Sequence, residues 1–237
     1  MEDIAPGLLE KVTKTFERNI KAAGLKQKAM IQKARDGTLK TITEYSGKVG
    51  EALAKAFAEE ITPDVLPDGI LYYNIANRVI IPPVNQAYVM VSDVADEIQA
   101  TNNAKAGIGL KPIRPPLEIA RIKGLIDLVT DGNMEDNAHF LDEPVKNLVN
   151  HFGDNHMEKN AEFLEGSGVE VTVTRTAEAT CCAWCAERAG VYDSFEEAFK
   201  NEAFARHDGC QCEVEVTSRK GSGKMGRSGH GFIRSGR

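Results

Sequence analysis

The order of apolar and polar residues predicts a chain that is mainly helical over its first two thirds. Apolar side chains recur every three or four residues in segments 8–35, 38–60, 84–106 and 117–129, and again in a segment that starts at Glu143. This period places them on one face of an α-helix. Pro144 at an early position favours the start of that last helix, and the glycines at 166 and 168 predict its end.

Prolines divide this helical region. We expect Pro63 and Pro67 to break the chain, and Pro82-Pro83 to break it again, which leaves the short apolar segment 70–81 between them. Segment 107–116 contains three more prolines and is predicted to be a non-helical connector. The helices of residues 1–62 have two interpretations: a pair that packs on its own domain, or an arm that docks on a partner.

The pattern changes after residue 168. Segment 169–174 alternates apolar with polar residues and is rich in β-branched side chains, which predicts a half-buried strand. The sequence therefore predicts an α+β fold, with a mainly helical N-terminal and central part, a small C-terminal β-containing Cys/His knuckle and a disordered basic tail. The expected segments are a helical arm (1–62), a central helical region (63–168), the knuckle (169–216) and the tail (217–237).

Composition excludes several classes of protein. The chain has 237 residues, of which 42% are hydrophobic and 27% charged, as in ordinary globular proteins. Its longest aliphatic run is far shorter than the roughly 20 apolar residues of a membrane helix, so no membrane partner is expected. The N-terminus opens on acidic residues and lacks the apolar core of an export signal. All five cysteines lie within 181–212, which indicates a local cluster in a reducing compartment.

Charge is distributed unevenly. Residues 61–216 carry a net charge of −14, whereas 217–237 carry +6 and no acidic residue. The tail is rich in glycine and serine and has almost no apolar side chains, so it is not expected to fold alone. It is either a solubilising end or a phosphate-binding segment. Its candidate nucleic-acid contacts are Arg219, Lys220, Lys224, Arg227, Arg234 and Arg237.

The cysteine segment has the spacing of a metal site. Cys182 and Cys185 are separated by two residues, and so are His207 and Cys210. Such a spacing lets a single turn direct two ligands at one tetrahedral ion. We expect a structural zinc held by these four residues, with Cys212 as a competitor for either of the last two positions. The same residues are also compatible with metal-free thiols, with disulfide pairs or, less well, with a thioredoxin-type redox motif.

A second arrangement points to different chemistry. His156 and Glu158 precede Cys182 and Cys185, and zinc-dependent nucleobase deaminases use an H-x-E motif followed by P-C-x-x-C. In such a hydrolase His156, Cys182 and Cys185 would hold the metal, and Glu158 would transfer the proton. Cys181 stands where proline is expected, however, and His207 would have no role. This alternative predicts that His156, and not His207, lies beside Cys182.

The cysteine segment also resembles a known family. Residues 182–192 (CAWCAERAGVY) and 206–214 (RHDGCQCEV) are similar to the C-terminal motif of phage minor head proteins, the Mu F-like head morphogenesis family. That motif is C-x-x-C, a glycine, H-x-x-C-R-C and a strand. Here Gln211 replaces the usual arginine, which puts any role of that arginine in doubt. Segments 107–116, 121–127, 142–145 and 160–163 look like minor structural proteins of phages or prophages of Gram-positive bacteria.

The resemblance implies a non-enzymatic virion protein that is present in few copies. A protein of this family is expected inside the head at the portal vertex, and in the bacterial cytoplasm during assembly. It would act in head assembly or in DNA packaging or delivery. The implied partners are the phage portal protein, the major capsid protein and, through the basic tail, phage DNA. A third interpretation is a host nucleic-acid-binding module that acts through the tail alone.

Overall fold

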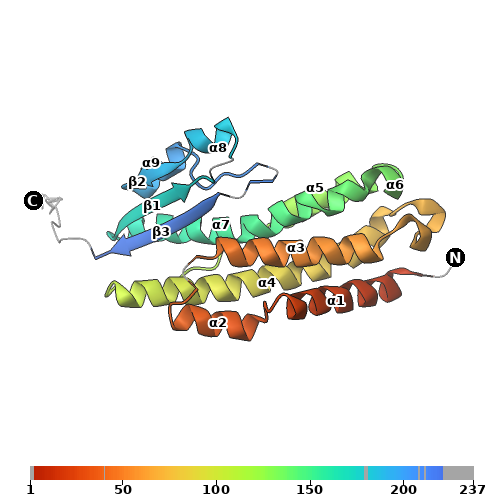
Figure 1. Cartoon of the computed structure of the whole chain (residues 1–237), viewed down its shortest axis with the longest axis horizontal. Helices are drawn as coiled ribbons and strands as arrows, with labels where there is room; N and C mark the ends of the chain where they lie inside the picture. The colour runs from red at the N-terminus through yellow and green to blue at the C-terminus, as the bar shows by residue number, and fades with distance from the viewer. Residues whose placement is uncertain (1–2, 40, 179–180, 208, 211, 221–237) are drawn as a thin grey trace, which may run out of the picture.

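The computed structural model describes residues 3–39, 41–178, 181–207, 209–210 and 212–220. Long helices form an elongated bundle, and a small sheet with two short helices lies along α7 (Figure 1). The α+β class is confirmed. The elements are α1 (Ala5–Ala22), α2 (Gln27–Arg35), α3 (Thr43–Glu60), η1 (Pro63–Val65), η2 (Pro67–Gly69), α4 (Tyr73–Lys105), α5 (Ile119–Thr130), α6 (Met134–Asn137), η3 (Ala138–Leu141), α7 (Glu143–Gly166), β1 (Glu170–Thr176), α8 (Ala183–Glu187), β2 (Gly190–Tyr192), α9 (Phe195–Lys200) and β3 (Glu213–Arg219).

The N-terminal segment contains two helices where the apolar period predicted one. The chain turns between α1 and α2 at Gly24, whose φ of +69° is a left-handed conformation that glycine adopts readily. The backbone N–H of Leu25 bonds to the carbonyl of Ile20 and closes the end of α1. The prediction of one continuous helix over 8–35 was therefore wrong. The next helix begins at Thr43, five residues later than expected.

The longest helix, α4, passes through the two prolines that were expected to interrupt it. Each proline removes a backbone donor and crowds a carbonyl one turn earlier, which costs about 3 kcal/mol or more in a helix interior. On both sides of Pro82 and Pro83 the apolar residues Val79, Ile80 and Val84 are fully buried. Packing of this helix against α1, α2, α5 and α7 offsets the cost. The predicted break at Pro82-Pro83 was therefore wrong.

Glycines allow α3 and α7 to approach closely. A Cβ atom on Gly50 would lie 3.1 Å from the Cα of Lys146 and 3.3 Å from the Cβ of Val149. A Cβ atom on Gly153 of α7 would lie 3.1 Å from the Cγ2 of Ile42. Side chains at either position would push the two helices apart. This close contact fixes α7, along which the sheet lies.

One hydrophobic core extends from the N-terminal helices to the sheet. Phe16 of α1, Phe57 of α3, Ile80 of α4, Val145 of α7 and Val173 of β1 are all fully buried in it. Helix α1 packs on α3 and α4, and α3 packs on α7. In this structure the N-terminal helices pack on the other helices of the same chain.

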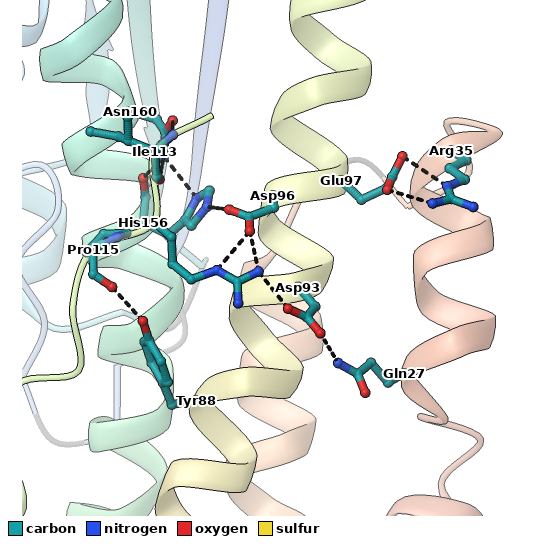
Figure 2. A network of polar contacts seen from close by, with 11 residues as sticks. Gln27, Arg35, Tyr88, Asp93, Asp96, Glu97, Ile113, Pro115, His156 and Asn160 are labelled. Atoms are coloured by element: carbon teal, nitrogen blue, oxygen red, sulfur yellow. Dashed lines mark hydrogen bonds and ion pairs between the residues drawn. The ribbon is translucent and has the colours of Figure 1, made fainter. Parts of the chain in front are cut away.

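Side chains replace the backbone hydrogen bonds that the connector between α4 and α5 lacks. As predicted, residues 107–116 are not helical. The amide of Asn160 on α7 bonds to both the N–H and the carbonyl of Ile113, at 2.9 and 2.8 Å. The hydroxyl of Tyr88 on α4 donates to the carbonyl of Pro115 at 2.6 Å (Figure 2). These bonds attach the proline-rich segment to the two helices that it crosses.

The sheet has three antiparallel strands in the order β2-β1-β3. Along β1, Val171, Val173 and Arg175 are buried, whereas the residues between them are partly exposed. Strand β3 continues to Arg219 and pairs along the whole of β1. The predicted boundary between knuckle and tail, at 216/217, was therefore wrong, because three residues assigned to the tail belong to this strand. Most of the predicted tail, residues 221–237, lies outside the described residues.

Candidate metal centre

Strand pairing brings together the two turns that the sequence predicted to meet. The Cys182–Cys185 turn follows β1, and the His207–Cys210 turn precedes β3. Strands β1 and β3 are antiparallel, with Thr176 opposite Glu213. The last residue of β1 and the first residue of β3 therefore lie side by side at the same end of the sheet. In the second turn the N–H of Cys210 bonds to the carbonyl of His207 at 3.1 Å.

The side chains of the two turns are in direct contact. The Nε2 atom of His207 lies 3.3 Å from the sulfur of Cys182 and 3.0 Å from the sulfur of Cys185. The sulfurs of Cys185 and Cys210 are 3.6 Å apart. Cys185, Cys210 and Cys212 are buried, whereas Cys182 is exposed.

Two overlapping groups of side chains have the geometry to hold a metal ion. Cys182, Cys185 and His207 form the first, and Cys185, Cys210 and Cys212 form the second. Within each group the ligand atoms lie within 4.8 Å of one another. Cys185 belongs to both groups and is therefore the centre of the cluster. Cys181 packs against the cluster and is partly buried.

A buried arginine lies beneath the sulfurs. Arg175 is 2% exposed and comes from the inward face of β1. One of its terminal nitrogens is 3.8 Å from the sulfur of Cys185 and 3.6 Å from that of Cys210. The other donates to the carbonyls of Ala203 and Ala205, at 2.9 and 2.5 Å. Arg175 was not predicted from the sequence as a residue of the site, although its place in the apolar alternation of β1 is unusual for a charged residue.

Trp184 supports the imidazole of His207 from within the first turn. The two rings meet edge to face, with centroids 5.3 Å apart and planes at 89°. The guanidinium of Arg188 stacks on the indole at 3.8 Å from its centroid, and Glu202 pairs with Arg188. This stack restrains the ring of His207 on the side of the tryptophan.

A buried ion pair attaches the second turn to the helical bundle. Arg206 forms two hydrogen bonds to the carboxylate of Asp154 on α7, and only 8% and 5% of their side chains are exposed. Arg206 also donates to the carbonyls of Cys210 and Cys212, at 3.4 and 2.9 Å. Burial opposes the charge of Arg206, but the attraction and hydrogen bonds of Asp154 outweigh it, so its pKa is raised. This ion pair was also missed from the sequence.

Two of the cysteines affect each other's protonation. Burial, together with hydrogen bonding to Cys212 and Cys210, raises the pKa of Cys185 to about 12. Burial also disfavours the thiolate of Cys210, but the N–H of Cys212 and the charge of Arg206 outweigh it and lower its pKa. In the absence of a metal, Cys210 therefore loses its proton before Cys185. A bound cation would favour the thiolate at both positions.

The alternative metal ligand His156 lies elsewhere. It is 2% exposed on α7, and its Nε2 donates to the carboxylate of Asp96 on α4 at 2.7 Å (Figure 2). Its Nδ1 lies 3.3 Å from the amide nitrogen of Asn160. Among the described residues His207, and not His156, lies beside Cys182. Glu158 is half-buried, and this burial raises its pKa.

The candidate nucleic-acid residues fall into two sets. Arg219 lies at the end of β3 and pairs with Glu170, although 82% of its side chain is exposed. Lys220 follows the strand and is exposed. Lys224, Arg227, Arg234 and Arg237 lie outside the described residues. Within the described part of the chain, no helix is long and apolar enough to cross a membrane.

Comparisons of this chain with protein-family models, with curated proteins and with solved structures found no match. The proposal below therefore depends on the residues of the chain and on their geometry.

Proposed function

We propose that this chain is a structural minor head protein of a tailed phage that acts at the portal vertex inside the head. The observation that carries the proposal is the contact between the C-x-x-C turn and the H-x-x-C turn. These are the two parts of the motif by which the sequence resembles the Mu F-like family. Contact between the two turns gives both parts of the motif one physical role, which is to hold the segment before β3 against the segment after β1.

We further propose that the cluster binds one structural zinc ion through Cys182, Cys185, His207 and Cys210. Tetrahedral zinc with sulfur at about 2.3 Å and imidazole at about 2.0–2.1 Å separates two sulfurs by about 3.8 Å, and a sulfur from a nitrogen by about 3.6 Å. The observed Cys185–Cys210 distance of 3.6 Å is close to the first value, whereas the sulfur–imidazole distances of 3.3 and 3.0 Å are about 0.3 and 0.6 Å shorter than the second. Cys212 competes for the fourth position.

The zinc hydrolase alternative has weaker support. It requires His156 to share an ion with Cys182 and Cys185, with Glu158 beside the ion. Both ring nitrogens of His156 instead face Asp96 and Asn160. Within the described residues, neither of the two Cys/His groups that could hold a metal includes His156.

The expected partners are the portal protein and the major capsid protein, and the basic tail would contact packaged DNA. Arg219 and Lys220 extend the positive charge of the tail to the end of β3, where the side chain of Arg219 faces solvent. A basic segment of this composition binds phosphates without reading sequence, and this binding weakens steeply with salt. The protein would reside in the head interior of the virion and, during assembly, in the bacterial cytoplasm.

The proposal is tested in the phage or prophage that encodes the chain. Heads purified by density gradient should contain the protein in a few copies per particle, and deletion of its gene should reduce the yield of infectious particles. Complementation with a Cys182→Ser, Cys185→Ser double variant should restore fewer particles than wild type, whereas Cys181→Ser should restore them fully. Absence of the protein from gradient-purified heads would refute the proposal.

A second arm separates this function from that of a host nucleic-acid-binding module. A variant that ends at Lys220 should still associate with heads and lose only its salt-sensitive affinity for DNA. If the truncated chain were lost from heads while full-length protein bound host DNA, the nucleic-acid module would be favoured instead.

A further inference from the structure

Among the described residues, Arg175 has no carboxylate partner of the kind that a buried cation normally has. Its guanidinium is almost inaccessible to water, and taking a charge out of water is costly unless an opposite charge compensates it. Within the described part of the chain, no carboxylate lies within 4 Å of this guanidinium. Arg206 is the other buried arginine of the Cys/His subdomain (residues 169–220), and it has Asp154 as its counter-ion. The charge of Arg206 is therefore balanced by a carboxylate, whereas no described carboxylate balances the charge of Arg175.

The groups around Arg175 are neutral carbonyls, an indole and two sulfurs. The carbonyls of Ala203 and Ala205 accept hydrogen bonds, and the ring of Trp184 lies 5.5 Å away. Carbonyls and an aromatic ring stabilise a cation in part, but they do not cancel its charge. Of the described groups that contact this guanidinium, the sulfurs of Cys185 and Cys210 are the ones that can become anions, and both are within reach of one terminal nitrogen.

We propose that Arg175 is the charge partner of the metal centre, and that it donates hydrogen bonds to two metal-bound thiolates whose excess negative charge it neutralises. This inference rests on the zinc site proposed above. A zinc ion with three thiolates and one neutral imidazole carries one unit of negative charge, which a single guanidinium balances. Arg175 is thus a positioning residue of the site and not a ligand.

The position of Arg175 explains why an arginine occupies a strand face that is otherwise apolar. Val171 and Val173 occupy the preceding inward positions of β1, and Arg175 is the last of the three. Arg175 lies near the end of β1, just before the chain continues to the Cys182–Cys185 turn. The planar guanidinium spans the carbonyls on one side and the sulfurs on the other, which a lysine ammonium, as a single point of charge, does not do.

The experiment compares zinc affinity and the cobalt spectrum of the full chain with those of three variants. Arg175→Gln removes the charge, Arg175→Lys retains it, and Arg219→Gln is the matched control. Arg219 is an arginine of the same sheet that lies at the end of β3 distant from the cysteines, pairs with Glu170 and has 82% of its side chain exposed. Affinity is measured by competition with a chromophoric chelator, and Co²⁺ replaces zinc for absorption spectroscopy.

Loss of an outer partner of a metal ligand typically weakens binding about 10- to 100-fold. We expect Arg175→Gln to lose zinc affinity in that range, Arg175→Lys to lose less, and Arg219→Gln to stay within about threefold of wild type. The sulfur-to-cobalt charge-transfer band should move to lower energy in Arg175→Gln, because the sulfurs lose their hydrogen-bond donor. A residue that only supports the fold would not shift this band.

Each result has a defined consequence. If the wild-type chain binds neither zinc nor cobalt, the proposed zinc site fails and this inference fails with it. If wild type binds zinc and Arg175→Gln binds it equally, with an unshifted band, only the role of Arg175 is overturned. If Arg175→Gln does not fold, the band of Arg175→Lys decides: it should lie below the wild-type energy, and an unshifted band would overturn the inference.

Discussion

The buried pair between Arg206 and Asp154 is predicted to hold the Cys/His subdomain on the helical bundle. Asp154→Asn retains the shape of the side chain but removes the negative charge, and Arg206 then stays buried with only backbone carbonyls and an amide as acceptors. Breaking one partner of a buried ion pair costs about 3–5 kcal/mol. We expect Asp154→Asn to lower the free energy of unfolding by about 3 kcal/mol, which is the lower end of this range, because the amide oxygen of the new asparagine still accepts one hydrogen bond from Arg206.

The free energy of unfolding is measured by urea denaturation of the full chain, followed by far-UV circular dichroism with zinc in excess. Glu170→Gln is the matched control, because the pair that Glu170 forms with Arg219 is largely exposed. This variant should lose less than about 1 kcal/mol, as surface ion pairs usually do. Hydrogen exchange should show that β3 loses protection in Asp154→Asn while α1 does not.

Two results would refute this reasoning. A loss below about 1 kcal/mol in Asp154→Asn would mean that the charge pair does not hold the subdomain in place. The double variant Asp154→Leu, Arg206→Met should be less destabilised than Asp154→Asn, because no unpaired charge stays buried. If the double variant were the less stable of the two, the cost would come from lost packing and not from an unpaired charge.

Three further predictions concern other parts of the molecule. Gly50→Ala should destabilise the chain by about 1–3 kcal/mol in urea denaturation because its Cβ meets α7, whereas Gly124→Ala in α5, with no atom within 4 Å, should stabilise it by about 0.5–1 kcal/mol; equal effects would contradict the close approach. Burial disfavours the charged form of Asp96, but hydrogen bonds from His156 and Arg114 outweigh this effect and lower the pKa of Asp96. The charged carboxylate therefore stabilises the folded chain above the pKa that Asp96 has in the unfolded chain, and this stabilisation is lost as the pH falls through the lower pKa of the folded chain. Asp96→Asn should therefore reduce the loss of stability in urea denaturation as the pH falls below the ordinary pKa of an aspartate, and an unchanged loss would contradict this. Cys182→Ser should lower the melting temperature with zinc present but not after chelation; a difference that persists under chelator would exclude metal binding as its cause.

The helical part of the fold and the connector at 107–116 could be predicted from the sequence, but the continuity of α4 and the turn between α1 and α2 could not. Pro82 and Pro83 are strong local signals for a break, and burial of the surrounding face of α4 outweighs them. Gly24 is a weaker signal, and yet the chain turns there because a left-handed residue closes α1. Packing against distant segments overrides local helix propensity, and a single sequence does not show which segments will pack together.

The candidate site was partly accessible from the sequence because ligand spacing is a local property. The two turns were predicted from their Cys and His residues, and pairing of β1 with β3 explains why they meet. Arg175, Asp154 and Arg206 were not identified, because a buried charge depends on partners distant in the chain. The alternation along β1 contained a signal for Arg175, since an inward charged residue in an apolar strand requires a partner.

The most direct test of the central claim is X-ray absorption at the zinc K-edge of the purified full-length chain. The account predicts one zinc per chain, with three sulfur neighbours at about 2.3 Å and one nitrogen neighbour at about 2.0–2.1 Å. A protein that contains no zinc, or zinc surrounded only by nitrogen and oxygen, would contradict the claim that the two turns are closed by a metal ion.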